Sequence, residues 1–304
     1  LTLSAAGCAQ LAQLQAMKAF KAANAAYQQQ DYKKAAGLYE EALEANPDLV
    51  QAYFFLGNSY DQQYRPGRKG EPANDELLTK AVDYYQKAAN ALGNSEVAEE
   101  KKVGKLALEY LVAAYGADKL NDPAAAEPVV QRMIQLEPGE TSNYFALAKI
   151  YEDAGVYDEA ERMLLAAREA RPNDPTVYMQ MAGYYNRQAD FDKTIDALTQ
   201  RTKVEPTNPE AFFTISTYYW DNAQRNALLS DADKRVQVEK GLEAVNKALE
   251  IKSDYMEALV YKGLLLRVQA TLEKEYPKQQ ALIKEANELR DQAEEIKKKR
   301  QTGD

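Results

Sequence analysis

The chain has 304 residues, of which 38 are Lys or Arg and 47 are Asp or Glu, so its formal net charge at pH 7 is −9. It contains no histidine and a single cysteine, which excludes a Ser-His-Asp triad, a His-ligated metal site, an internal disulfide and a Cys-x-x-Cys motif. The acidic balance argues against non-specific binding of nucleic acid, because such binding needs Lys and Arg to displace the counterions of the phosphates.

The chain begins with LTLSAAGC, in which Cys8 follows small residues. This end resembles the last part of a bacterial lipoprotein signal, where the cysteine thiol receives lipid after cleavage. Ala5 stands where leucine is usual, and a small buried cysteine in an N-terminal helix is the alternative. We therefore predict a signal-peptide remnant at residues 1–16, Cys8 as the lipidation candidate, and export by a bacterium to the periplasm, the outer membrane or the extracellular space.

The middle of the chain repeats itself with a period of about 34 residues. Apolar residues recur within each unit at spacings of three and four, which predicts two amphipathic helices per unit. Proline ends the second helix, because the residue before a proline avoids helical geometry. Two units align without a gap, and their matching positions are Tyr144, Leu147, Ala148, Tyr151, Tyr157 and Pro172 in one and Tyr178, Met181, Ala182, Tyr185, Phe191 and Pro206 in the next.

The other units carry insertions. A count that allows for them gives seven units, and the last runs into a charged helix from Pro277 to Arg300. The insertion at residues 61–77 predicts a surface loop, whose basic cluster of Arg65, Arg68 and Lys69 could alternatively contact an acidic patch on another copy. The insertion at residues 221–240 predicts a helical extension of its hairpin.

The repeat resembles the tetratricopeptide repeat, a helix-turn-helix unit of about 34 residues. This resemblance implies an all-α, right-handed superhelical solenoid of about seven repeats over residues 17–276, followed by a C-terminal capping helix at residues 277–304. One hairpin cannot bury its own apolar face, so we expect neighbouring hairpins to stack and to fold as a unit.

The resemblance also implies that an inner face, lined by the first helix of each unit, binds extended peptides or partner helices. Apolar residues at the fifth place of the repeat favour either an apolar groove for a partner segment or helix packing within the stack. A clamp for a carboxylate is not expected, because phenylalanines replace the lysines it needs. Trp220, the only tryptophan, is the preferred anchor. The predicted partner-binding residues are Phe20, Asn24, Phe54, Asn58, Phe145, Met179, Phe213 and Trp220.

No pair of carboxylates stands out as an acid and base, and no glycine-rich phosphate loop or calcium loop occurs. We therefore predict a non-catalytic protein without cofactor or metal. Its predicted function is an interaction scaffold that binds a protein or peptide in an aromatic-lined concave groove, with membrane contact only through lipid on Cys8. The alternative is a structural subunit that stacks head to tail with its own copies into an extracellular filament or tube.

Overall fold

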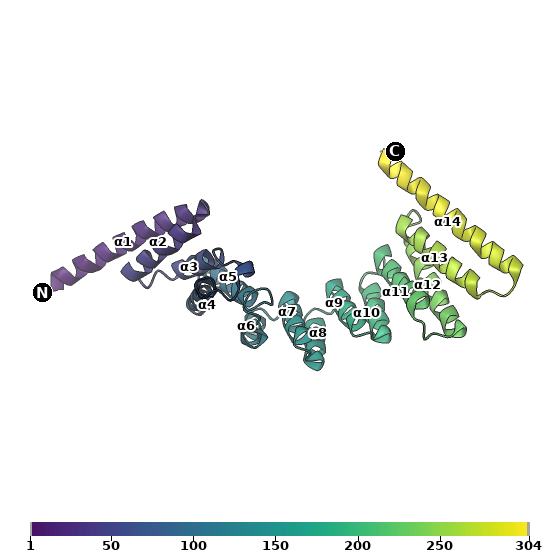
Figure 1. Ribbon diagram of the computed structural model, residues 1–304, viewed down its shortest axis with the longest axis horizontal. Helices are drawn as coiled ribbons and strands as arrows, with labels where there is room; N and C mark the ends of the chain where they lie inside the picture. The colour runs from purple at the N-terminus through teal and green to yellow at the C-terminus, as the bar shows by residue number, and fades with distance from the viewer. Residues whose placement is uncertain (1, 303–304) are drawn as a thin grey trace. The chain divides into compact units, whose positions relative to one another are not determined.

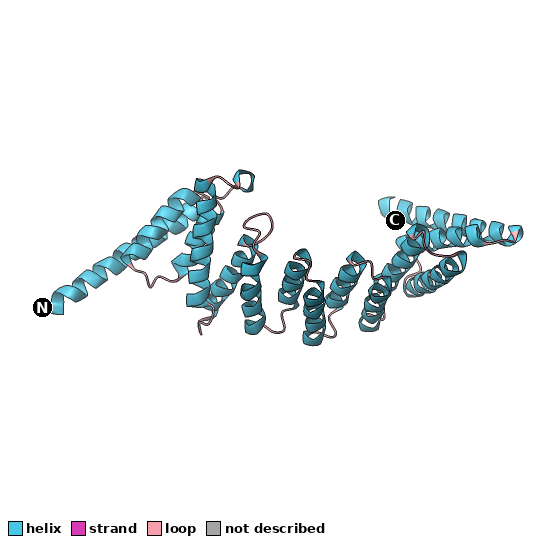
Figure 2. Ribbon diagram, turned by 60° about the horizontal axis from the view of Figure 1, so that its bottom comes forward, coloured by secondary structure: helices cyan, strands magenta, loops and turns pink. Residues whose placement is uncertain are grey.

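The computed structural model describes the backbone of residues 2–302 and the side chains of residues 10–301. This part of the chain contains the α-helices α1 to α14, one short 3-10 helix and no strand (Figure 2). The predicted all-α fold class is confirmed.

The helices form seven successive pairs, which match the seven predicted units. Each pair consists of a first helix, a turn or loop, and a second helix (Figure 1). The pairs are α1 (Thr2–Gln28) with α2 (Tyr32–Ala45), α3 (Gln51–Asp61) with α4 (Pro72–Leu92), α5 (Ala98–Ala114) with α6 (Pro123–Leu136), α7 (Thr141–Asp153) with α8 (Tyr157–Ala170), α9 (Pro175–Arg187) with α10 (Phe191–Val204), α11 (Pro209–Arg225) with α12 (Asp231–Ile251), and α13 (Met256–Leu272) with α14 (Tyr276–Thr302).

The chain divides into two compact units, which we call unit 1 (residues 1–166) and unit 2 (residues 167–304). In unit 1, each helix from α1 to α7 packs against the next one in the chain, and the first helices α3 and α5 also touch. In unit 2, the same order holds from α9 to α14, and α11 also touches α13. Consecutive hairpins therefore stack within each unit, as repeats that cannot bury their own apolar faces must.

The helix α1 runs without a break through the predicted signal-peptide remnant. Its backbone is helical from Thr2 to Gln28, so the predicted boundary at residue 16 falls inside a helix. The backbone of Cys8 lies in this helix, but its side chain lies outside the described residues. Lipidation of Cys8 and export of the protein stay predictions.

Three of the turns inside hairpins have the same geometry. Gln30, Gly155 and Ala189 occupy the middle of three-residue turns with φ angles of 62°, 74° and 57°. This left-handed conformation reverses the chain within three residues. After Ala189, the side chain of Asp190 accepts a hydrogen bond from the backbone nitrogen of Lys193 at 3.0 Å and caps α10. A short, polar turn thus brings the two helices of a hairpin together.

Tyrosine hydroxyls tie successive hairpins to each other. In three repeats the tyrosine near the start of the first helix donates to the carbonyl oxygen of the proline six positions earlier. Phe212 takes the same place after Pro206 and has no hydroxyl to donate. The three bonds are Tyr53 to Pro47 at 3.0 Å, Tyr144 to Pro138 at 3.0 Å and Tyr178 to Pro172 at 2.7 Å.

Two glycines allow α4 and α5 to meet backbone to backbone. A Cβ atom on Gly104 would lie 2.5 Å from the backbone nitrogen of Gly93 and 2.6 Å from the carbonyl carbon of Leu92. No side chain fits there unless the helices separate, because real Cβ atoms do not approach a backbone so closely. This contact sets how α5 leaves the end of α4.

The two insertions take the forms expected of them. Residues 62–71 form a loop with a short helix at Pro66–Arg68, and α4 begins directly after it. The buried side chain of Asn74 orders the loop, because it accepts from the Arg65 nitrogen at 2.9 Å and donates to the carbonyl of Arg68 at 3.1 Å. In the second insertion, α11 extends to Arg225 and α12 starts at Asp231, which confirms the helical extension.

Candidate functional site

The fifth places of the first helices do not form one uniformly exposed strip. Phe54 is only 4% exposed and belongs to the core of unit 1. The expectation that a partner could contact it is wrong, because the hairpin would have to open first. Of the other fifth places, Phe20, Phe145 and Phe213 are half-buried, whereas Glu109, Met179 and Val260 are exposed.

The two N-terminal phenylalanines pack against the second helices of their own hairpins. The ring of Phe20 lies 5.8 Å from that of Tyr39, and the ring of Phe54 lies 5.9 Å from that of Tyr85. Phe54 also meets Tyr110 edge to face at 5.6 Å. At these two places the sequence position serves helix packing, which was the second of the two interpretations left open above.

The predicted asparagines are engaged inside unit 1. Asn24 accepts a hydrogen bond from the hydroxyl of Tyr39 at 2.6 Å. Asn58 is buried, accepts from the hydroxyl of Tyr27 at 2.6 Å and donates to the oxygen of Tyr85 at 3.2 Å. A partner could reach Asn58 only by displacing these tyrosines, so its placement in the predicted binding set is also corrected.

A buried ion pair continues the hydrogen bonds of Asn58. The hydroxyl of Tyr85 donates to Oδ2 of Asp61 at 3.2 Å, and Nζ of Lys119 lies 2.6 Å from Oδ1 of the same carboxylate. The side chains of Lys119 and Asp61 are 20% and 5% exposed. Burial, and then the negative charge of Asp61, raise the pKa of Tyr85 far above its usual range. This network joins α1, α3 and α4 to the segment after α5, so its role is structural.

A groove crosses three first helices of unit 2. We call it the Trp220 groove. Its volume is about 270 Å³, and it receives Asn186 from α9 and Tyr261 from α13. Trp220, the predicted anchor, lies in it and is half-buried. The remaining lining residues all come from α11 and are Thr217, Tyr218, Asp221 and Arg225.

Aromatic contacts hold Trp220 in place. Its ring meets Tyr261 edge to face, with centroids 5.4 Å apart and an interplanar angle of 78°. Tyr261 meets Phe213 in the same way at 5.2 Å and 88°. Such contacts stabilise a ring by about 0.5 to 1.5 kcal/mol beyond area burial. Trp220 therefore offers a partner a partly exposed ring whose orientation is already set.

Polar groups surround this ring. Asp221 and Arg225 form an ion pair at 2.9 Å across one helical turn, and both side chains are at least half exposed. Exposed pairs of this kind contribute only about 0.2 to 1 kcal/mol, so either group can exchange its partner for a ligand at little cost.

Met179 lies on the same set of helices. Its sulfur accepts a hydrogen bond from Nη1 of Arg201 at 3.0 Å, and Nε of the buried Arg201 donates to Glu205 at 2.8 Å. Met179 thus covers a buried guanidinium while its own side chain stays 37% exposed.

The groove contains residues that the sequence analysis missed. Asn186 stands one repeat period of about 34 residues before Trp220, so the alignment of the repeats could have identified it. Tyr261 directly follows the fifth-place residue Val260. Nothing in the sequence singled out Tyr218 among 21 tyrosines.

Metal and membrane binding were also considered. Among the residues whose side chains are described, no group of three or more His, Cys, Asp or Glu could hold a metal ion. Likewise, none of the helices in the described part of the chain is sufficiently long and apolar to cross a lipid bilayer.

Hairpins that stack in chain order, with a groove across successive first helices, define a helical-repeat protein of the kind that binds other proteins. Two family models, each described as tetratricopeptide repeat (TPR), match residues 20–96 and 119–182. The chain is a TPR protein, which confirms the resemblance. This family is generally a non-enzymatic fold for protein interaction.

Solved structures show the same fold. The C-terminal part of a TPR repeat-containing protein from Cytophaga hutchinsonii is 13% identical, has a TM-score of 0.54, and its match covers 91% of this chain and 98% of that chain. YrrB, described as a TPR protein with an unusual peptide-binding site, is 21% identical with a TM-score of 0.39 and a match over 63% of this chain and 87% of its own. MamA from Desulfovibrio magneticus is 15% identical with a TM-score of 0.41 over 64% and 95%. No curated protein matches the sequence.

Proposed function

We propose that this TPR protein is an interaction scaffold that binds a peptide segment of a partner protein in the Trp220 groove. The observation that carries the proposal is the meeting of three successive first helices around one tryptophan, which Tyr261 orients edge to face. Interfaces draw most of their binding energy from a few such rings, with Trp and Tyr over-represented among them.

The lining of the groove favours an extended segment with an apolar side chain. The indole of Trp220 and the ring of Tyr261 offer apolar surface, while Asn186 and Thr217 offer hydrogen-bonding groups for a peptide backbone. The fifth places Met179, Phe213 and Val260 lie on the same three helices and extend the surface that a longer segment would contact.

The first test replaces the anchor. Peptides selected from a displayed library on the full chain are expected to lose about 2 kcal/mol of binding free energy, roughly thirtyfold in Kd, in Trp220→Ala, because the central ring is removed. Affinity is measured by isothermal titration calorimetry. With the wild-type chain, the fluorescence of its single tryptophan should also change on binding.

Two further variants make this test specific. Tyr276→Ala removes an exposed aromatic ring of unit 2 that lies outside the groove and should leave affinity unchanged. Arg225→Glu changes an exposed groove residue and should weaken binding without lowering the melting temperature. Selected peptides that bind Trp220→Ala as tightly as the wild type would refute the groove as the binding site.

Self-association is the second candidate function, and one surface feature favours it. Leu11, Leu14 and Met17 follow each other at spacings of three on α1 and are 58%, 68% and 49% exposed. The helix α1 has 27 residues and α2 only 14, so the first part of α1 extends past its partner (Figure 1). An apolar row without cover on one helix face is typical of an interface. A contact between two α1 helices is self-complementary and closes as a dimer rather than growing into a filament.

Light scattering after size-exclusion chromatography tests this candidate. The wild-type chain should elute with twice the mass of the 34.1 kDa monomer, and the double variant Leu11→Gln, Leu14→Gln should elute as the monomer. The control Leu228→Gln removes an isolated exposed leucine of unit 2 and should stay dimeric. A wild-type monomer at concentrations of about 0.1 mM would reject self-association through α1.

A further inference from the structure

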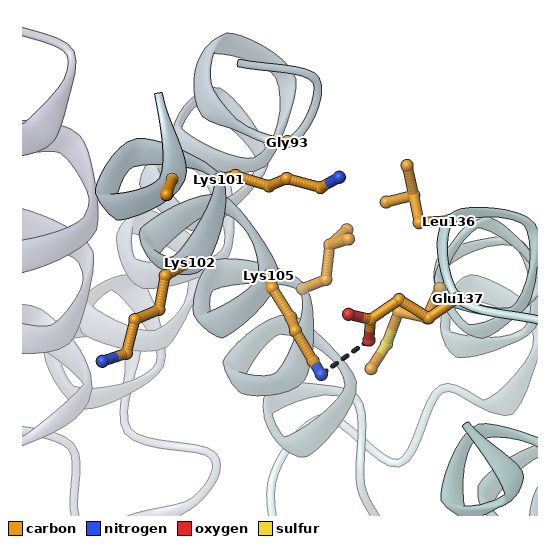
Figure 3. Close-up of a pocket in the computed structure, with 9 residues that line it drawn as sticks. Gly93, Lys101, Lys102, Lys105, Leu136 and Glu137 are labelled. Atoms are coloured by element: carbon orange, nitrogen blue, oxygen red, sulfur yellow. Dashed lines mark ion pairs between the residues drawn. The ribbon is translucent and has the colours of Figure 1, made fainter. Parts of the chain in front are cut away.

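A second cleft lies in unit 1, between the first turns of α5, the end of α6 and the residue that follows α4. Its volume is about 270 Å³. The backbone contact of Gly93 with Gly104 brings α5 against the end of α4 and so forms one wall. The lining residues are Gly93, Ala98, Lys101, Lys102, Lys105, Leu108, Met133, Leu136 and Glu137 (Figure 3).

The cleft combines apolar surface with an excess of positive charge. Leu108, Met133 and Leu136 supply the apolar part, and three lysines face one glutamate among the lining residues. Nζ of Lys105 and Oε2 of Glu137 form an ion pair at 2.6 Å, with side chains 39% and 40% exposed. A pair this exposed contributes little free energy, so a second carboxylate can replace Glu137 at Lys105 without a large penalty.

The two neighbouring lysines of α5 differ in direction. Figure 3 shows the side chain of Lys101 reaching across the cleft toward Leu136, whereas Lys102 points away from it. Within the part of the chain that the structure describes, neither ammonium group forms an ion pair. Lys101 therefore places a positive charge beside apolar surface with no acidic group of the protein to neutralise it.

We propose that this cleft binds a short acidic segment of a partner protein, in which a carboxylate side chain lies next to an apolar one. The carboxylate pairs with Lys101, and the apolar side chain packs on Leu108, Met133 and Leu136. Pockets for whole small molecules span about 300 to 1,000 Å³, so a cleft of 270 Å³ suits one or two residues of a peptide. The site is in unit 1 and selects a charge, so it is distinct from the Trp220 groove.

Fluorescence anisotropy with labelled peptides on the full chain tests the chemistry. The probe alternates Asp and Leu over five residues, and two controls replace every Asp by Asn or every Leu by Ser. The first peptide should bind at least about tenfold more tightly than either control, because only it offers both groups. The chain carries a net charge of −9, so general attraction cannot produce this result. Equal binding of a control, or no binding of the probe up to about 1 mM, overturns the proposal.

The pair of lysines provides a matched set of variants. Lys101→Glu turns attraction into repulsion inside the cleft and should weaken the probe about tenfold, whereas Lys102→Glu makes the same change of net charge and should alter affinity less than about twofold. Glu137→Gln removes the competing carboxylate and should strengthen binding. The measurements are made at about 0.15 M salt, where charges beyond about 8 Å are screened. Equal losses in the two lysine variants would overturn the assignment to the cleft, and Trp220→Ala, which disables the other groove, should leave this binding unchanged.

Discussion

Unit 1 is expected to unfold as the pH rises from about 10 to about 12. Its buried phenols keep their protons more tightly in the folded chain than in the unfolded one. Tyr39 and Tyr85 are fully buried, and burial is the largest cause that raises the pKa of each. Burial also raises the pKa of Tyr27, Tyr60, Tyr64, Tyr84, Tyr115 and Tyr151 in the same unit.

The sign follows from proton linkage. Above the ordinary tyrosine pKa of about 10, the unfolded chain releases phenol protons that the folded chain retains, so the free energy of unfolding falls with pH. This stabilisation is complete below pH 10 and is lost as the pH rises toward the raised folded-state values. Each fully buried tyrosine contributes a loss of about 1.4 kcal/mol per pH unit. Tyr39 and Tyr85 together therefore remove about 5 kcal/mol by pH 12, which is comparable with the whole stability of many domains.

Two optical signals check this prediction. Tyrosinate absorbance at 295 nm should rise in a cooperative step that coincides with the loss of helical circular dichroism at 222 nm. The variant Tyr39→Phe keeps the ring and removes one phenol, so its unfolding free energy should fall less steeply with pH. Complete tyrosine ionisation with the helical signal intact would contradict the burial on which the prediction depends.

Lys119→Met is expected to destabilise unit 1 by about 3 kcal/mol. The substitution keeps the length of the side chain and removes the ammonium group that lies 2.6 Å from Asp61. The carboxylate of Asp61 is 5% exposed, so it would stay charged in the interior with only the hydroxyl of Tyr85 to stabilise it. Removing one partner of a buried ion pair is costly for this reason. Urea unfolding, followed by circular dichroism, measures the difference.

Two comparisons isolate the effect of burial. Lys149→Met breaks a second Lys–Asp pair of unit 1, whose side chains are 62% and 57% exposed, and should cost less than about 0.5 kcal/mol. Adding Asp61→Asn to Lys119→Met removes the orphaned charge and should restore part of the stability. If the two lysine substitutions cost the same, the argument from burial fails.

Much of the fold follows from patterns along the chain. The period of about 34 residues identified seven hairpins, because an amphipathic helix depends on spacings of three and four within one segment. Polar turns and prolines then placed the ends of the helices. The same pattern identified Trp220, which lies in the groove of unit 2. A spacing of six between proline and tyrosine, as in Pro172 and Tyr178, was a further local signal for the contact between hairpins.

The exposure of equivalent positions depends on packing between hairpins. Phe54 and Met179 occupy the same place in their repeats, yet one is buried against Tyr85 and Tyr110 while the other is exposed. Asn58 resembles a ligand-binding residue in sequence, but neighbouring tyrosines occupy its side chain.

Charged groups show the same dependence on three-dimensional contacts. Asp61 meets Lys119 from a distant part of the sequence, and the adjacent residues Lys101 and Lys102 point in different directions. A periodic pattern reports which face of a helix is apolar, because that depends on local backbone geometry. Whether a given residue is buried, paired or open to a partner depends on side chains that approach from other helices, and those neighbours are known only once the hairpins have packed.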